Sequence, residues 1–310
     1  MRLNLVMTCI FVSAITFAQN ITLLKQNVTI NRHIDGTLLL PEKYKNAPLA
    51  ILIADSGPTD RDGNQNFMQN NSLKKLAESL TKKGVVTFRY DKRIVKQLKS
   101  GNIDASITFD DFITDAVSVL HYFQNKYSFS AIHIIGHSQG SLVGMVAAKE
   151  GADGFISIAG AGHTIDDVIT EQIDKTAPMF TKDAKRVFDI LKEGKTTTDF
   201  PPALASVFNS DVQPFMSSWM YYDPKKELAQ LNIPILVING TKDLQVSEEE
   251  AISLKSASKH AQMQIIENMN HILVPIEGDD LDNSKSYNES QREISPQLID
   301  TIITFINNSN

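Results

Sequence analysis

The sequence predicts an α/β protein in which a mainly parallel sheet is covered by helices on both faces and carries an inserted helical cap. Short apolar runs bounded by turn residues alternate with longer amphipathic stretches, as expected when buried parallel strands are joined by helices. One long helical segment, residues 163–231, interrupts this alternation. With 310 residues, 42% of them hydrophobic and 21% charged, the chain can bury a large core.

The expected elements follow from these patterns in chain order. A first hairpin is expected from residues 28–34 and 37–40, because Asp35-Gly36 between them is a strong turn signal. Parallel strands are predicted at residues 49–54, 85–90, 131–135, 155–159, 233–239 and 262–267. Helices are predicted at residues 72–82, 109–127, 141–149, 248–258 and 296–307, and residues 275–295 read as a polar surface loop.

The cap is expected over residues 163–231, inserted between core segments 19–162 and 232–310. It contains amphipathic stretches but no strand-like run, and its aromatic residues are predicted to form its own core and one wall of an apolar pocket. We expect Trp219, Tyr222 and the bordering His163 to contact a bound substrate.

The first 18 residues predict a secretory signal peptide. One basic residue, Arg2, precedes an apolar run that ends in Ala18, a small residue suited to signal peptidase cleavage. The run is short for a membrane span, so a secreted or periplasmic protein without a stable membrane anchor is expected. The single cysteine, Cys9, lies in this run, and the mature chain would therefore contain no thiol.

The charge balance limits the class of partner. Thirty Lys and Arg residues against 36 Asp and Glu residues give a net charge of −6, with no long basic run. This argues against a nucleic-acid partner and favours a small neutral or apolar molecule.

The most informative motif is Gly136-His137-Ser138-Gln139-Gly140, which lies between a predicted strand and a predicted helix. This is the context in which a Gly-x-Ser-x-Gly turn exposes a nucleophilic serine at the head of a sheet. The glycines allow the strand and helix backbones to approach, and the helix N-terminus favours a developing oxyanion. Ser138 is therefore the candidate nucleophile.

A serine nucleophile needs a base and a residue that orients that base. Asp243 follows the predicted strand 233–239, and His271 follows the predicted strand 262–267. Their order after Ser138 matches the order Ser, Asp, His expected for this kind of turn. We therefore expect Asp243 to orient His271, the general base.

The oxyanion formed in such a reaction needs two backbone N–H donors. Gln139, directly after the serine, supplies the first. The second is expected from the loop after the strand 49–54, where Pro58 has no N–H and Ser56 is preferred over Gly57. No histidine pair has metal-ligand spacing with a nearby carboxylate, so neither a catalytic metal nor a cofactor is predicted.

Six motifs together carry a resemblance to a known family. They are Asp55-Ser56-Gly57-Pro58-Thr59-Asp60-Arg61-Asp62-Gly63-Asn64, Tyr90-Asp91-Lys92-Arg93, Gly136-His137-Ser138-Gln139-Gly140, Tyr222-Asp223-Pro224, Gly240-Thr241-Lys242-Asp243-Leu244-Gln245-Val246 and Asn270-His271. Over nearly the whole mature chain they resemble the α/β-hydrolase superfamily, most closely its secreted bacterial carboxylesterases of the serine-aminopeptidase-like branch.

The resemblance implies cofactor-free hydrolysis of small-molecule esters through an acyl-enzyme. It implies Ser138 as nucleophile, Asp243 and His271 as its partners, and Ser56 and Gln139 as oxyanion donors. The chain departs from many relatives where they have His-Gly before the oxyanion residue, because it has Ala54-Asp55 there. An extra carboxylate is therefore expected near the site.

Three alternatives remain open from the sequence. The same residues could cleave amides or act as an aminopeptidase, for which Glu171, Asp174 and Asp183 are candidate ligands of a free amino terminus. They could also act as a thioesterase. The third reading is a catalytically silent binding protein with the same fold.

Overall fold

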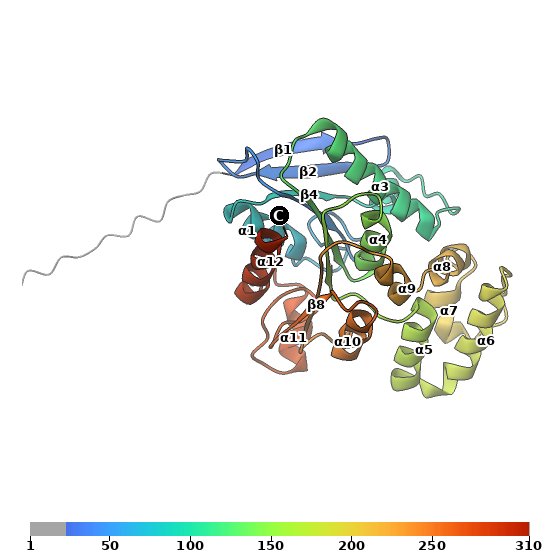
Figure 1. Cartoon of the computed structure of the whole chain (residues 1–310). Coiled ribbons are helices and arrows are strands. Elements are labelled where there is room, and N and C mark those ends of the chain that lie inside the picture. The colour runs from blue at the N-terminus through green and yellow to red at the C-terminus, as the bar shows by residue number, and fades with distance from the viewer. Residues whose placement is uncertain (1–22, 310) are drawn as a thin grey trace, which may run out of the picture.

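The computed structural model describes residues 23–309 and is built around one eight-stranded sheet (Figure 1). Its strand order is β1-β2-β4-β3-β5-β6-β7-β8. The strands are β1 (Leu24–Thr29), β2 (Asp35–Leu40), β3 (Leu49–Ile53), β4 (Val86–Tyr90), β5 (Ile132–His137), β6 (Gly154–Ile158), β7 (Ile235–Gly240) and β8 (Gln262–Ile266). β2 runs antiparallel to β1 and β4, whereas the other neighbouring pairs are parallel. The predicted mainly parallel sheet is confirmed.

Helices cover both faces of this sheet. They are α1 (Ser72–Lys82), α2 (Arg93–Ser100), α3 (Phe109–Lys126), α4 (Gln139–Ala148), α10 (Glu248–Ser256), α11 (Asp280–Ser286) and α12 (Pro296–Asn308). Successive side chains of β3 point to opposite faces, so Leu49 and Ile51 join an apolar cluster with α3, α4 and α10, while Ala50 and Leu52 join one with α1 and α12. The continuous apolar run of β3 is thus explained by burial on both sides.

The first hairpin forms, but its turn is not where the sequence indicated it. Residues 30–34 make the turn, and Gly36 pairs with Val28 inside the ladder between β1 and β2. Gly36 packs against the Phe88 ring so closely that an added Cβ would lie 2.1 Å from a ring carbon. The glycine is therefore required by close packing rather than by a turn.

Most predicted strand and helix boundaries agree with the structure, but two helices outside residues 163–231 are not predicted. The six strands expected from residue 49 onward and the five predicted helices agree within two residues. The short helix α2 was not predicted. Residues 275–295 were expected to be a loop, but they contain α11, which begins after the Asp279 N-cap, whose side chain accepts hydrogen bonds from two backbone amides.

Between β6 and β7 the described chain contains helices and no strand. They are α5 (Ile165–Thr176), α6 (Thr181–Lys192), α7 (Ala205–Phe208), α8 (Gln213–Met220) and α9 (Pro224–Ala229), with short 3-10 turns at Pro178–Phe180 and Pro202–Leu204. α5 to α8 lie together beyond α9 at one side of the molecule (Figure 1) and share an apolar cluster of their own. This is the segment for which the sequence predicts a cap.

The signal peptide predicted for residues 1–18 lies outside the described residues. Within residues 23–309, no helix has both the length and the apolar character needed to span a membrane.

Candidate active site

Ser138 lies in a strained turn between β5 and α4. Its backbone has φ 53° and ψ −118°, which is costly for a residue with a Cβ. The flanking glycines allow this turn, because a Cβ on Gly136 would lie 2.3 Å from the Gly140 carbonyl oxygen and one on Gly140 would lie 2.4 Å from the Ile53 oxygen. The structure therefore gives Ser138 the local geometry that the motif predicts.

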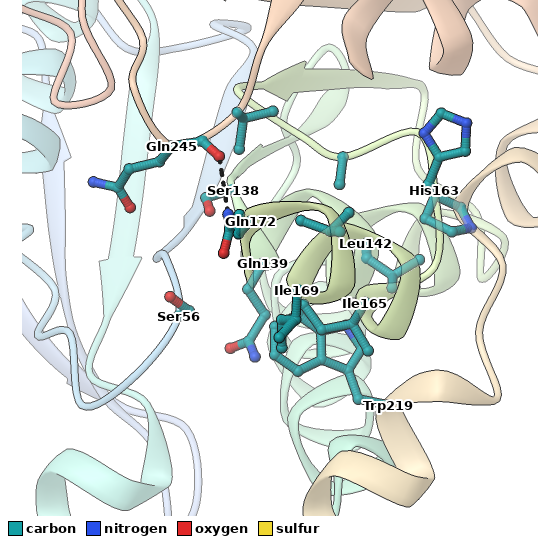
Figure 2. A pocket seen from close by; sticks show the side chains of 14 residues that line it. Ser56, Ser138, Gln139, Leu142, His163, Ile165, Ile169, Gln172, Trp219 and Gln245 are labelled. Atoms are coloured by element: carbon teal, nitrogen blue, oxygen red, sulfur yellow. Dashed lines mark hydrogen bonds between the residues drawn. The ribbon is translucent and has the colours of Figure 1, made fainter. Parts of the chain in front are cut away.

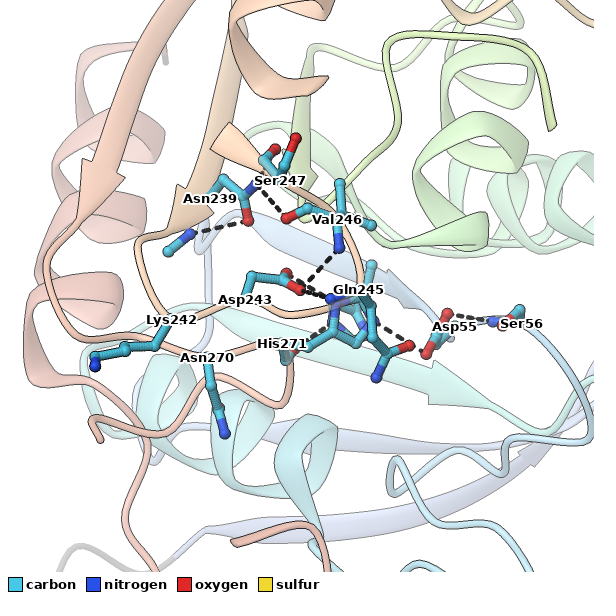
Figure 3. A network of polar contacts seen from close by, with 12 residues as sticks. Asp55, Ser56, Asn239, Lys242, Asp243, Gln245, Val246, Ser247, Asn270 and His271 are labelled. Atoms are coloured by element: carbon cyan, nitrogen blue, oxygen red, sulfur yellow. Dashed lines mark hydrogen bonds and ion pairs between the residues drawn. The ribbon is translucent and has the colours of Figure 1, made fainter. Parts of the chain in front are cut away.

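Asp243 is held rigidly in the loop after β7. Its Oδ1 accepts hydrogen bonds from the Gln245 and Val246 amides at 2.8 and 2.9 Å. Its Oδ2 lies 2.8 Å from His271 Nδ1, and both side chains are only 1% exposed (Figure 3). The structure thus brings these two predicted residues together in the arrangement that fixes an imidazole tautomer.

The loop that carries His271 is fixed by buried polar contacts. The Asn270 side chain donates to Asn283 Oδ1 at 2.8 Å and to Ser286 Oγ at 2.9 Å, which ties the loop to α11. His137 Nε2 donates to the His271 carbonyl oxygen at 2.8 Å. Because a carbonyl can only accept, this contact requires the proton of His137 to be on Nε2.

Asp55 contacts three parts of the site at once. Its Oδ2 lies 3.3 Å from His271 Nε2, and its Oδ1 accepts a hydrogen bond from the Ser56 amide (Figure 3). The Ser138 hydroxyl lies near enough to this carboxylate to help lower the pKa of Asp55. Among the described contacts, Ser138 and His271 therefore both meet Asp55 instead of each other. The sequence placed an extra carboxylate near the site, but not these contacts.

The charges around His271 change its protonation. Burial alone would lower its pKa, but the charges and hydrogen bonds of Asp243 and Asp55 raise the pKa of His271 to about 10. Burial alone would raise the pKa of Asp55, but contacts with His271, His137 and Ser138 hold it well below its usual range. Burial and the His271 charge lower the pKa of His137. The two carboxylates on either side of the ring therefore favour the charged form of His271.

Lys92 connects the two backbone segments expected to supply the oxyanion donors. Its buried Nζ donates to the Asp55 carbonyl oxygen and, at 3.2 Å, to Gln139 Oε1. The ammonium also lies 5.2 Å from the centre of the Phe112 ring. Burial lowers the pKa of Lys92 to about 8. No role for Lys92 is predicted from the sequence, although the residue belongs to the Tyr90-Asp91-Lys92-Arg93 motif.

Two ion pairs fix the loop that carries Asp55 to the end of β4. Arg61 bonds Asp91 through both its backbone N–H and its guanidinium, each at 2.9 Å. Arg89 Nε bonds Asp62 at 2.8 Å. These pairs explain Arg61 and Asp62, and the Asp60 carboxylate accepts the Asp62 and Asn64 amides. Ser56, in the same loop, lines one cavity with Ser138.

That cavity, of about 280 Å³, is apolar apart from its catalytic end (Figure 2). Ser56, Ser138 and Gln139 lie at that end, and most of the remaining wall is aliphatic or aromatic. That part of the wall is formed by Leu142, Ala161, Ile165, Val168, Ile169, Trp219, Pro224 and Val246. Gln172 of α5 donates to the Gln245 carbonyl oxygen at 3.3 Å, which ties the inserted helices to the loop of Asp243.

A second, mainly apolar cavity of about 580 Å³ lies beside the first and shares Gln139, Ile169 and Trp219 with it. Two carboxylates, Asp104 and Asp211, also line this larger cavity. Trp219 is held by stacking on Phe109, with ring centroids 5.5 Å apart and planes 3° apart. The predicted pocket residue Trp219 therefore lines both cavities and separates them.

The other two predicted pocket residues are placed differently. His163 lines the smaller cavity, but its Nδ1 pairs with Glu250 at 2.9 Å and its Nε2 accepts from Ser253 at 3.3 Å. Tyr222 is not among the described residues that line either cavity. Its hydroxyl donates to Asp110 at 2.6 Å, so the expectation that Tyr222 contacts substrate has no support from its position.

The described residues bring one group of possible metal-binding side chains together, Asp55, His137 and His271, with donor atoms within 4.8 Å of one another. The sequence spacing did not reveal this group. Several of its donor atoms already have partners, since His137 Nε2 bonds a carbonyl and His271 bonds a carboxylate on each side. We identify no metal ligands here, and the absence of a catalytic metal stays a prediction.

Comparison with curated proteins finds one informative relative, and no family model matches the chain. The chain is 26% identical over 261 residues to Esterase EstD of Thermotoga maritima. The match covers 82% of this chain and 61% of EstD, so the chain spans less than two thirds of that relative.

Solved structures share the fold over almost the whole chain. Est1E from Butyrivibrio proteoclasticus matches with a TM-score of 0.59 and 15% identity, over 92% of this chain and 98% of that one. The meta-cleavage product hydrolase CumD from Pseudomonas fluorescens matches with a TM-score of 0.52 and 15% identity, over 89% and 96%. At these identities the likeness concerns the fold.

Proposed function

We propose that this chain is a serine esterase of the α/β-hydrolase superfamily that cleaves carboxylic esters of small apolar substrates. The observation that carries the proposal is that Ser138, Ser56 and Gln139 line one end of a mainly apolar cavity, while the Asp243–His271 pair reaches the Ser56 loop through Asp55. The similarity to Esterase EstD supports hydrolysis of an ester.

The proposed mechanism has two acyl-transfer steps. Neutral His271 takes the proton of Ser138 as the hydroxyl oxygen attacks the ester carbonyl, and the Ser56 and Gln139 N–H groups stabilise the oxyanion. His271 then protonates the leaving alcohol. Water, deprotonated by His271, hydrolyses the acyl-enzyme and restores Ser138. Asp243 holds the imidazole in the required tautomer and stabilises its charged form.

The two cavities support an ester with an apolar group on each side of the carbonyl. They meet at Gln139, whose backbone N–H is a proposed oxyanion donor, and Trp219 divides them. One apolar arm of the ester would fill the smaller cavity and the other would extend into the larger one.

The aminopeptidase alternative is less favoured. None of the described residues that line the smaller cavity is Asp, Glu, Lys or Arg. The three acidic candidates are engaged elsewhere, Glu171 with Lys175, Asp174 with Thr181 and Asp183 with Arg186. A free amino terminus would therefore meet no carboxylate from this set in the cavity. No contact described above separates an ester from a thioester.

We also propose that the protein is exported to the periplasm or beyond, and that residues 163–231 act as the cap. Sequencing the N-terminus of the exported protein tests the first point. A mature chain that begins at Gln19 is expected, and retention of residues 1–18 would contradict it.

A substrate panel tests the proposed activity. Purified mature protein and its Ser138→Ala variant are assayed with p-nitrophenyl acetate, butyrate and octanoate, with the matching thioesters, and with aminoacyl p-nitroanilides. Turnover of esters that is lost in Ser138→Ala is the expected result. Turnover of anilides alone would favour an aminopeptidase, and no turnover by folded protein would favour a binding protein.

A further inference from the structure

Asp55 occupies the positions that a reacting ester would need. One carboxylate oxygen accepts the Ser56 N–H, where the substrate oxyanion is expected, and the other faces His271 Nε2 at 3.3 Å. The Ser138 hydroxyl is near enough to the same carboxylate to help lower its pKa. Asp55 thus resembles a carboxylic acid product bound across the oxyanion donor, the base and the nucleophile.

On the basis of the function proposed above, we propose that Asp55 is an autoinhibitory carboxylate that must leave the oxyanion site before Ser138 can be acylated. In the resting arrangement the carboxylate blocks His271 Nε2, the nitrogen that must take the serine proton. It also occupies the Ser56 N–H, which must bind the oxyanion. Both effects end when the side chain turns away.

Several titratable groups surround His271, and those that contact it meet different atoms. Asp243 faces Nδ1 from the loop after β7, and His137 approaches from the end of β5 with its Nε2 on the His271 carbonyl. Tyr287, which follows α11, lines a small cavity together with Asp55, His137 and His271, and its hydroxyl accepts a hydrogen bond from Gln245 at 3.1 Å. Of these groups, Asp55 is the one that pairs with Nε2.

The backbone of Asp55 can stay in place while the side chain moves. Lys92 bonds the Asp55 carbonyl oxygen from behind the loop, and the ion pairs of Arg61 and Arg89 fix the residues that follow. The Asp55 side chain is 13% exposed, and the adjacent Ser56 borders the substrate cavity. Rotation of one side chain therefore frees the Ser56 N–H without rebuilding the loop.

Departure of Asp55 is coupled to the loss of one proton from His271. When Asp55 leaves as a carboxylate, His271 loses one stabilising charge and releases a proton from Nε2 to water. Neutral His271 then accepts the Ser138 proton during attack. Because Asp55 must leave first, only a fraction of the protein is competent at any time. This fraction is the same for every ester, so the bound Asp55 lowers all rates alike.

Two substitutions at Asp55 separate its charge from its volume. Asp55→Asn keeps the shape and removes the charge, whereas Asp55→Ala also empties the oxyanion site. Asp300→Asn, which removes a carboxylate from an exposed pair with Lys83, is the control for net charge. The measured quantity is kcat/KM for p-nitrophenyl acetate and butyrate between pH 5.5 and 10.

The expected results have a definite order. Asp55→Asn should raise kcat/KM at pH 7 by about tenfold or more, because each unit of decrease in the His271 pKa gives about tenfold more neutral imidazole. The rising limb of the pH profile should move to lower pH, and Asp55→Ala should exceed Asp55→Asn. Both esters should gain by the same factor, and Asp300→Asn should match the wild type.

Three results would overturn the proposal. A lower kcat/KM for both Asp55 variants at every pH would make Asp55 a required catalytic group. A gain confined to one ester would make it a wall of the acyl site. An Asp55→Ala variant no faster than Asp55→Asn would mean that the oxyanion site was never blocked.

A second measurement separates this proposal from the proposed function. Nitrogen-15 NMR of imidazole-labelled protein follows the protonation of His271 in a Ser138→Ala background, where no ester is turned over, with His271→Asn for assignment. Asp55→Asn should lower the pH at which His271 deprotonates. An unchanged titration would overturn the Asp55 proposal even if esters are hydrolysed, and a shifted one would support the pairing even if the protein hydrolyses none.

Discussion

The two carboxylates that face His271 come from loops of different construction. Asp243 lies 2.8 Å from Nδ1, is 1% exposed and accepts two backbone amides. Asp55 lies 3.3 Å from Nε2, is 13% exposed and accepts one amide, that of its neighbour Ser56. In the proposed mechanism the first carboxylate supports the base and the second obstructs it. Whether a carboxylate supports or obstructs the base therefore depends on which ring nitrogen of His271 it contacts, more than on its negative charge.

Removal of the supporting carboxylate should have the largest effect. Replacement of the orienting aspartate by asparagine in a Ser-His-Asp triad lowers kcat by about 10⁴-fold, because the imidazole takes the wrong tautomer. We expect a loss of this order for Asp243→Asn in steady-state ester hydrolysis. A variant within tenfold of the wild type would show that Asp243 and Asp55 do not have the different roles assigned to them.

Loosening the loop of Asp55 should have a smaller effect. Lys92→Met removes the ammonium that bonds the Asp55 carbonyl and Gln139 Oε1, and leaves both acceptors without it. We expect kcat to fall by about 10- to 100-fold, below the cost of losing a whole oxyanion donor, and the free energy of unfolding to fall by about 1–3 kcal/mol.

The control for this change is Lys99→Met, whose ammonium is 66% exposed and makes a long contact to Asp91. It should leave kcat unchanged. If Lys92→Met lowered stability but not kcat, Lys92 would hold the fold without positioning the oxyanion donors.

The two carboxylates should also be visible in stability as a function of pH. The pKa of His271 is raised from an ordinary value of 6.5 to about 10, so its pairing stabilises the fold fully below about pH 6.5 and is lost as pH rises through about 10. Each unit of difference between the folded and unfolded pKa contributes about 1.4 kcal/mol.

Urea unfolding at pH 6.5, 8 and 10 measures this dependence. The free energy of unfolding should fall less steeply with pH in Asp55→Asn than in the wild type, because one of the two charges that hold the imidazolium is absent. Parallel curves for the two proteins would indicate that Asp55 does not stabilise the charged ring.

The smallest change in rate is expected from the wall between the cavities. Both carboxylates lie outside the residues that line the two cavities, so Trp219→Ala should alter ester preference without moving the pH profile. We expect the ratio of kcat/KM for octanoate over acetate esters to rise severalfold as the cavities merge. An unchanged ratio would remove Trp219 from the substrate site, and a shifted pH profile would indicate that the cavity and the acid-base residues are coupled.

The difference between the two loops also explains which parts of the site can be predicted from the sequence. Ser138, Asp243 and His271 follow predictable strands, and the carboxyl ends of parallel strands meet at one edge of a sheet. Their placement at the same edge of the sheet is a consequence of topology. The direction of the Asp55 side chain depends on a loop fixed by contacts such as Arg61 to Asp91, 30 residues apart, which no local pattern encodes.

The same holds at two other positions. The local sequence Asp35-Gly36 predicts a turn, but the Phe88 ring on another strand determines the role of Gly36. Aromatic neighbours predict that Tyr222 contacts substrate, which stays a prediction, and Asp110 on α3 determines where its hydroxyl points. In each case the deciding residue is distant in sequence.

Labelling with a fluorophosphonate probe tests the central claim most directly, because the probe reacts covalently with a serine that is activated by an adjacent base. The mature protein and its Ser138→Ala and Asp243→Asn variants are labelled at pH 7 and pH 9, and the modified peptide is identified by mass spectrometry. We predict labelling of the wild type at Ser138 alone, faster at pH 9, strongly reduced in Asp243→Asn and absent in Ser138→Ala. Labelling that persists in Ser138→Ala, or none in folded wild-type protein at either pH, would contradict the account.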